Sequence, residues 1–147
     1  MFGVPSWVEP YIGIKFVDEG DDFSGCHCWG LVRLIYRRER QIELPRYAGI
    51  LAGNRDGIVD AVKTAIQERE WLPVLGAWQP FDVVLMSDYW RGPDGALRKG
   101  NGHIGIAVSA RDLLHVKTGI DVCCVGKDEM TIKKRIVGAY RFNALPA

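Results

Sequence analysis

The chain has 147 residues, of which 48% are hydrophobic and 25% are charged, and its formal net charge is +1. This size and composition are typical of a single globular core, so we expect residues 1–147 to form one domain. The near-neutral charge gives no argument for nucleic acid or an anionic membrane surface as a partner. No window approaches the roughly 18 consecutive apolar residues that indicate a membrane span.

The N-terminal stretch MFGVPSWVEPYIG has no early basic residue and no long apolar run, so we predict no secretory signal and synthesis in the cytoplasm. Its prolines and glycines predict turns and short irregular pieces over the first 25 residues. In a reducing compartment the four cysteines are expected to be free thiols. They are Cys26, Cys28, Cys123 and Cys124.

Two helices are predicted in the first half of the chain. Apolar residues recur at helical spacing from Cys28 onward, and Pro45 marks a point by which this helix has ended. A second apolar pattern over 58–66 predicts another helix, with Asn54 or Asp56 as its start signal.

After Pro73 the chain is rich in short β-branched and aromatic segments separated by turn residues. Helices followed by neighbouring strands predict an α+β domain with an antiparallel sheet. The segment 89–102 reads as a long, turn-rich loop, and loops of that length are often functional. The predicted strands are 82–86, 103–108, 112–117, 120–125 and 135–142.

His103 begins one predicted strand and His115 lies within the next, so a hairpin would make them cross-strand neighbours. A two-residue turn would place two residues with an even difference in number on opposite faces of the sheet. We therefore predict an odd-length loop or a bulge around 109–111 if the two histidines form a pair.

Cys28 is the better nucleophile of the two cysteines in SGCHCWGLVR, because it falls at a helix start, where backbone N–H groups and the helix dipole favour a thiolate. Gly30 leaves room two residues later for a substrate carbonyl. Cys26 lies outside the helix, and His27 is a poor base for its sequence neighbour. A histidine on a facing strand would supply the base, as in cysteine hydrolases generally.

A metal site is the rival interpretation, since two cysteines and two histidines match the ligand set of zinc. The C-x-C spacing is tighter than the usual one, however, and the histidines are not in an H-x₃₋₅-H pair. A redox pair is disfavoured because C-x-x-C is absent. We therefore predict no metal and no cofactor.

Cys123 and Cys124 lie in a predicted strand, so their side chains should point to opposite faces of the sheet. We expect both to be buried free thiols.

Five ordered segments resemble the NlpC-type cell-wall cysteine peptidases, especially those of tailed phages and gene transfer agents. They are CWGLVRLIY (28–36), PFDVVLM (80–86), GHIGIAV (102–108), LLHV (113–116) and RIVGAYRF (135–142). The resemblance implies a papain-like α+β fold in which the first helix carries the cysteine and packs on a small antiparallel sheet. It also implies hydrolysis of peptidoglycan stem peptides, typically between D-glutamate and diaminopimelate.

By position, Cys28 matches the nucleophile of this family, His103 the base and His115 the residue that orients the base. The mechanism that follows is attack by the Cys28 thiolate, protonation of the leaving amine by His103, and hydrolysis of the acyl-enzyme, with backbone N–H groups at the helix start holding the oxyanion. Trp29, Gly30 and Tyr11 are candidate substrate-binding residues. Other tail-tip or baseplate proteins are the implied partners, in a virion-like tail particle made in the bacterial cytoplasm.

Three positions depart from the family pattern. His27 replaces the usual Asp before the cysteine, Phe16 replaces a frequent Tyr for which Tyr11 is a substitute, and Phe81 replaces the glycine of a G-D pair that retains Asp82. These departures favour one alternative, a catalytically weak or inactive structural adaptor of a tail or baseplate with the same fold. A zinc-binding module, suggested by the cysteines and histidines, is a less favoured alternative.

Overall fold

The structure is a computed structural model that describes residues 4–46 and 55–143, and for 55–59, 90 and 101 the backbone alone. A short 3₁₀ helix, η1 (Ser6–Tyr11), and a small hairpin of β1 (Asp21–Asp22) and β2 (Gly25–Cys26) precede the first α-helix. The helices are α1 (Cys28–Arg40), α2 (Arg55–Gln67) and the short α3 (Met130–Lys133). Both predicted helices are confirmed; of the two start signals proposed for the second, Asn54 lies outside the described residues.

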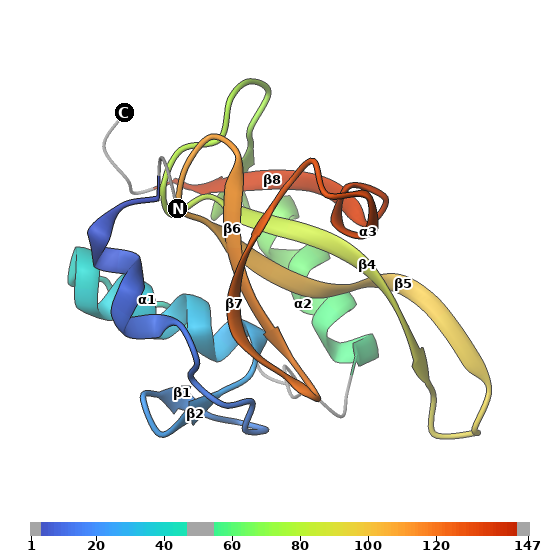
Figure 1. Cartoon of the computed structure of the whole chain (residues 1–147). Helices are drawn as coiled ribbons and strands as arrows, with labels where there is room; N and C mark the ends of the chain where they lie inside the picture. The colour runs from blue at the N-terminus through green and yellow to red at the C-terminus, as the bar shows by residue number, and fades with distance from the viewer. Residues whose placement is uncertain (1–3, 47–54, 144–147) are drawn as a thin grey trace.

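The described residues contain one six-stranded antiparallel sheet in the order β3-β8-β4-β5-β6-β7. All five predicted strands are present in this sheet, of which the sequence analysis missed the short β3; it also missed the two short strands β1 and β2. Helices followed by a meander of neighbouring strands confirm the α+β class with an antiparallel sheet (Figure 1). The strands are β3 (Trp71–Pro73), β4 (Val83–Arg91), β5 (Leu97–Ala107), β6 (Asp112–Lys117), β7 (Ile120–Gly126) and β8 (Ile136–Phe142).

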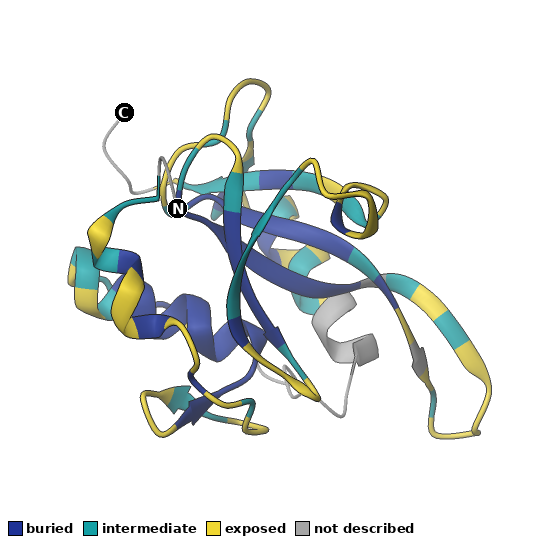
Figure 2. Cartoon of the chain, in the orientation of Figure 1, coloured by how far each residue is buried: buried dark blue, intermediate teal, exposed yellow. Residues whose placement is uncertain are grey.

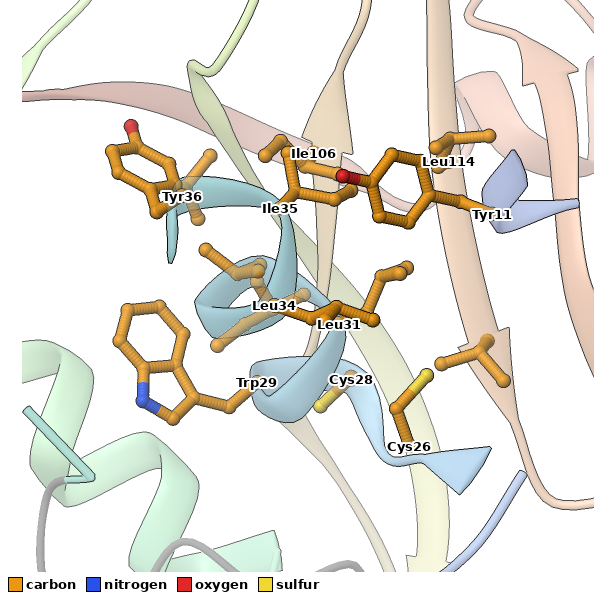
Figure 3. Packing of buried hydrophobic residues seen from close by; sticks show 14 of the residues in the cluster. Tyr11, Cys26, Cys28, Trp29, Leu31, Leu34, Ile35, Tyr36, Ile106 and Leu114 are labelled. Carbon is orange, nitrogen blue, oxygen red and sulfur yellow. The ribbon is translucent and has the colours of Figure 1, made fainter. Parts of the chain in front are cut away.

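The main core lies between α1 and one face of the sheet. Leu31 and Ile35 of α1 are almost fully buried and belong to the same cluster as Ile106 of β5 and Leu114 of β6 (Figure 3). Helix α1 contacts both β5 and β6. Figure 2 shows that buried residues are concentrated in the first turns of α1, in the inner half of β5 and in β6. This packing fixes the start of α1 relative to the two histidine-bearing strands.

The prediction of a loop at 89–102 is wrong, because this segment is the outer half of a long β-hairpin. Strand β4 continues to Arg91 and pairs with Leu97 of β5, so that only 92–96 form the turn. The glycines and charged residues of this segment favour an irregular loop. Pairing between β4 and β5 nevertheless makes it a hairpin, because it satisfies the hydrogen-bonding groups of the backbone. In Figure 1 the hairpin extends well beyond the body of the sheet.

Asp82 joins the start of β4 to the end of β8. Its carboxylate is fully buried and accepts two hydrogen bonds of 2.8 Å from Arg141. It also accepts a hydrogen bond from the backbone N–H of Gln79 at 2.8 Å. Asp82, the aspartate of the G-D pair, and Arg141, the second arginine of the motif RIVGAYRF (135–142), therefore form one structural ion pair.

Phe81 shows why glycine is frequent at its position in the resembled pattern. Its φ of 79° lies in the left-handed region that favours glycine. The phenyl ring stacks on Trp7 at a centroid distance of 5.0 Å, and the guanidinium of Arg40 lies 5.1 Å from its centroid. These ring contacts offset part of the backbone strain.

Candidate active site

The start of α1 is held by contacts between near neighbours in the chain. His27 is the N-cap: its backbone is extended, and its Nδ1 accepts a hydrogen bond of 3.1 Å from the backbone N–H of Gly30. Cys28 is then the first residue of the helix, as predicted. Burial lowers the pKa of His27, which keeps Nδ1 unprotonated and able to accept this bond.

Glycines let the β1–β2 hairpin pack directly on this helix start. A side chain at Gly30 would collide with the backbone carbonyl of Gly20, and the N–H of His27 donates to that same carbonyl at 3.1 Å. Arg33 pairs with Asp21 on the hairpin and donates to the carbonyl of Leu44 at 2.9 Å. The space beside Gly30 is thus filled by the chain itself, and its missing side chain serves packing.

The other three cysteines are poorly suited to nucleophilic chemistry. Burial, assisted by the neighbouring Cys28 and Asp22, raises the pKa of Cys26 to about 12. Burial likewise raises the pKa of Cys124 to about 11 and that of Cys123 above its usual value. All four cysteines are free thiols. Cys28 alone stands at the start of a helix, where the dipole stabilises a thiolate (Figure 3).

His103 and His115 form the predicted pair. The Nε2 of His103 lies 3.0 Å from the Nδ1 of His115, and the two side chains are 2% and 6% exposed. The N–H of Val108 donates to the carbonyl of Asp112 at 2.9 Å, which leaves the odd-length loop 109–111 between β5 and β6. The predicted loop parity is confirmed, and the two histidines are diagonal neighbours on one face of the sheet.

Three charged residues lie close to one another near His115. Asp88 of β4 is 6% exposed and lies 4.0 Å from Lys117 Nζ and 3.8 Å from Arg135 Nη1. The pKa of His115 is lowered, first by burial and then by the positive charges of Lys117 and Arg135, with Asp88 opposing them. Sequence reasoning did not single out these three residues, because only the sheet brings them together.

The three predicted substrate-binding residues are all buried and have contacts within the protein. Trp29 donates from Nε1 to the carbonyl of Pro45 at 2.9 Å and packs edge-on against Trp71. Tyr11 donates to Glu39 at 2.5 Å, and burial raises its pKa. Gly30 packs against the β1–β2 hairpin. These contacts give all three a structural role, and their contact with substrate stays a prediction.

The structure also bears on the metal alternative and on the membrane. Within the residues described, no three or more His, Cys, Asp or Glu side chains gather in a way that would hold a metal ion. Among the same residues, no helix is both long and apolar enough to cross a membrane. In β7, Cys124 packs against the main core, while Cys123 lies opposite His115 of β6. Both thiols are only half-buried, so the prediction that they are buried is wrong.

A helix-start cysteine, a sheet packed on that helix and a histidine pair on adjacent strands define a papain-like α+β fold. The model of the NlpC/P60 family matches residues 13–141, and the chain belongs to this family. A search of curated proteins found no match.

Solved structures agree with this fold. The NlpC/P60 domain of the peptidoglycan hydrolase SagA is 19% identical, with a TM-score of 0.55 and 92% coverage of both chains. A lipoprotein-like NLP/P60 protein of Staphylococcus aureus is 16% identical, with a TM-score of 0.59, and an NlpC/P60 protein of Bacillus cereus is 16% identical, with a TM-score of 0.56. These matches cover 92% and 95% of the chain, which spans 38% and 41% of those two proteins.

Proposed function

We propose that the protein is a cysteine peptidase that hydrolyses peptide bonds in peptidoglycan stem peptides. The observation that carries this proposal is the 3.0 Å contact between His103 Nε2 and His115 Nδ1, on the two strands that α1 contacts. Membership of the NlpC/P60 family supports the substrate class, since the SagA domain belongs to a peptidoglycan hydrolase. The bond we propose as the target is that between D-glutamate and diaminopimelate.

In the proposed mechanism Cys28 attacks the scissile carbonyl as a thiolate. His103 carries the proton as an imidazolium and transfers it to the leaving amine, and it then activates the water that hydrolyses the acyl-enzyme. His115 orients His103 through the Nε2···Nδ1 contact. The N–H of Gly30 is bound to His27, so the backbone N–H of Cys28 is the donor we assign to the oxyanion.

Cleavage of a muropeptide that contains diaminopimelate, followed by liquid chromatography and mass spectrometry, tests this function. We expect wild-type protein and Cys26→Ala to cleave it and Cys28→Ala to have no activity. Circular dichroism of each variant controls for folding. Full activity of Cys28→Ala would refute the mechanism. A folded wild-type protein without activity would favour the structural adaptor instead.

We further propose that the protein works at the tip or baseplate of a phage-like tail and helps it to penetrate the cell wall. This biological role rests on the resemblance of the five ordered motifs, from CWGLVRLIY (28–36) to RIVGAYRF (135–142), to the tail-associated branch. Mass spectrometry of purified tail particles from the source bacterium, with immunogold labelling, tests it. Particles that lack the chain would contradict the role.

A further inference from the structure

The contact between His103 and His115 limits how protons can be distributed over the pair. At 3.0 Å, only one hydrogen fits between His103 Nε2 and His115 Nδ1. If His103 is an imidazolium, its Nε2–H donates, and His115 must be neutral with a bare Nδ1. If His115 is the imidazolium, its Nδ1–H donates to Nε2, and His103 is neutral. Only the first arrangement provides the charged partner that a Cys28 thiolate needs.

The surroundings of the two rings are unequal in charge. Lys117 of β6 and Arg135, just before β8, are cations that disfavour a proton on His115. Asp88 of β4 and Glu129, just before α3, are anions that act in the opposite direction. Burial adds to the effect of the cations and is the largest single cause. Taken together, burial and the four charged side chains disfavour a proton on His115 and lower its pKa.

Asp88 holds the two cations in place. Its side chain is 7% exposed and lies within 4.0 Å of both Lys117 Nζ and Arg135 Nη1. The side chains of Lys117 and Arg135 are only 23% and 38% exposed, so water screens their charges incompletely. Lys117 and Arg135 each act on His115 more strongly than Asp88 or Glu129, so the four charges together disfavour a proton on His115.

We propose that Lys117 and Arg135, held by Asp88, are positioning residues that confine the positive charge of the histidine pair to His103. The inference rests on the proposed function of the pair and extends it to residues that do not touch the reacting atoms. The cations act through His115: by keeping it neutral, they make it a permanent acceptor for His103 Nε2–H. The proton of the Cys28 thiol then resides on His103.

NMR titration of the two imidazoles tests this proposal without any assay of cleavage. The full chain is compared with Lys117→Met and Arg135→Met, and with Lys63→Met, which removes one exposed positive charge from α2. The variant His115→Asn assigns the imidazole resonances of His115, because these signals are lost from its spectrum. We expect the pKa of His115 to rise in the first two variants and not in Lys63→Met. Lys117→Arg, which keeps the charge, should titrate as wild type does.

Alkylation of Cys28 by iodoacetamide at pH 7, followed by mass spectrometry, gives a second measurement. Its rate should fall by about threefold in Lys117→Met, the effect expected of one partly exposed charge. An unchanged His115 pKa in both methionine variants, or an unchanged alkylation rate, overturns the proposal. If Lys117→Met does not fold, Lys117→Gln and Arg135→Gln replace the methionine variants. Failure of the proposed function is seen separately, as a wild-type protein that cleaves no muropeptide.

Discussion

The start of α1 and the histidine pair are held in place by different kinds of contact. At the helix start the decisive contacts are local, because the cap joins His27 to Gly30 and the glycine packs against Gly20. The histidines meet only because β5 and β6 pair in one register across the loop 109–111. Local order survives small changes elsewhere, whereas a shift of one residue in register would separate the histidines. Each half of the candidate site therefore has its own weak points.

The largest expected effect comes from breaking the histidine side directly. His103→Ala removes the proposed base and should lower kcat/KM by about 10³-fold or more, the range of general acid–base catalysis. His115→Asn keeps an acceptor for His103 Nε2–H and should retain more activity than His115→Ala. Steady-state kinetics on a muropeptide measure all three variants. Equal losses in the two His115 variants would show that the acceptor is not what His115 provides.

The next largest effect is expected from breaking the ion pair between Asp82 and Arg141, which joins the start of β4 to the end of β8. Asp82→Ala leaves Arg141 without its buried partner and should lower the free energy of unfolding by about 3–5 kcal/mol. Urea denaturation measures the loss. Asp94→Ala, which removes an exposed ion pair with Arg98 and a hydrogen bond from the backbone N–H of Ala96, is the control and should cost much less than Asp82→Ala. A small cost for Asp82→Ala would contradict this account of the motif.

A smaller effect is expected from overpacking at the helix start. Gly30→Ala places a methyl group against the carbonyl of Gly20 and should cost about 1–3 kcal/mol while slowing alkylation of Cys28. Gly76→Ala is its control, because nothing lies within 4 Å of a side chain there. Thermal unfolding compares the two. Equal stability of both variants would mean that the β1–β2 hairpin does not confine Gly30.

The smallest effect is the pH dependence of the cap. His27→Ala should lose about 1 kcal/mol at pH 7.5, whereas His27→Asn retains a cap and should lose little. Because burial lowers the pKa of His27 below its usual 6.5, the folded protein binds fewer protons than the unfolded chain just below that pH. The cap's stability is therefore complete above 6.5 and is lost as the pH falls below it.

Denaturation of wild type and His27→Asn between pH 5 and 8 checks this sign. The asparagine cap does not titrate, so the variant should gain stability relative to wild type as the pH falls. A constant difference across this range would show that the cap does not depend on a neutral His27. The remaining histidines titrate in both proteins and cancel in the comparison.

The sequence alone determined the features that depend on residues close together in the chain and on the alternation of side chains between the two faces of a strand. It placed Cys28 at a helix start, because the apolar spacing begins there, and it required an odd-length loop between His103 and His115. The loop predicted at 89–102 is wrong because pairing between β4 and β5 overrides the turn preference of its glycines.

Only the tertiary structure decided which groups surround these residues. Asp82 and Arg141 are 59 positions apart, and Asp88, Lys117 and Arg135 come from separate segments. No local pattern encodes such contacts, since they follow from the order of strands in the sheet. Burial, which sets the pKa of Cys26, His27 and His115, likewise arises only when the helix and the sheet are packed together.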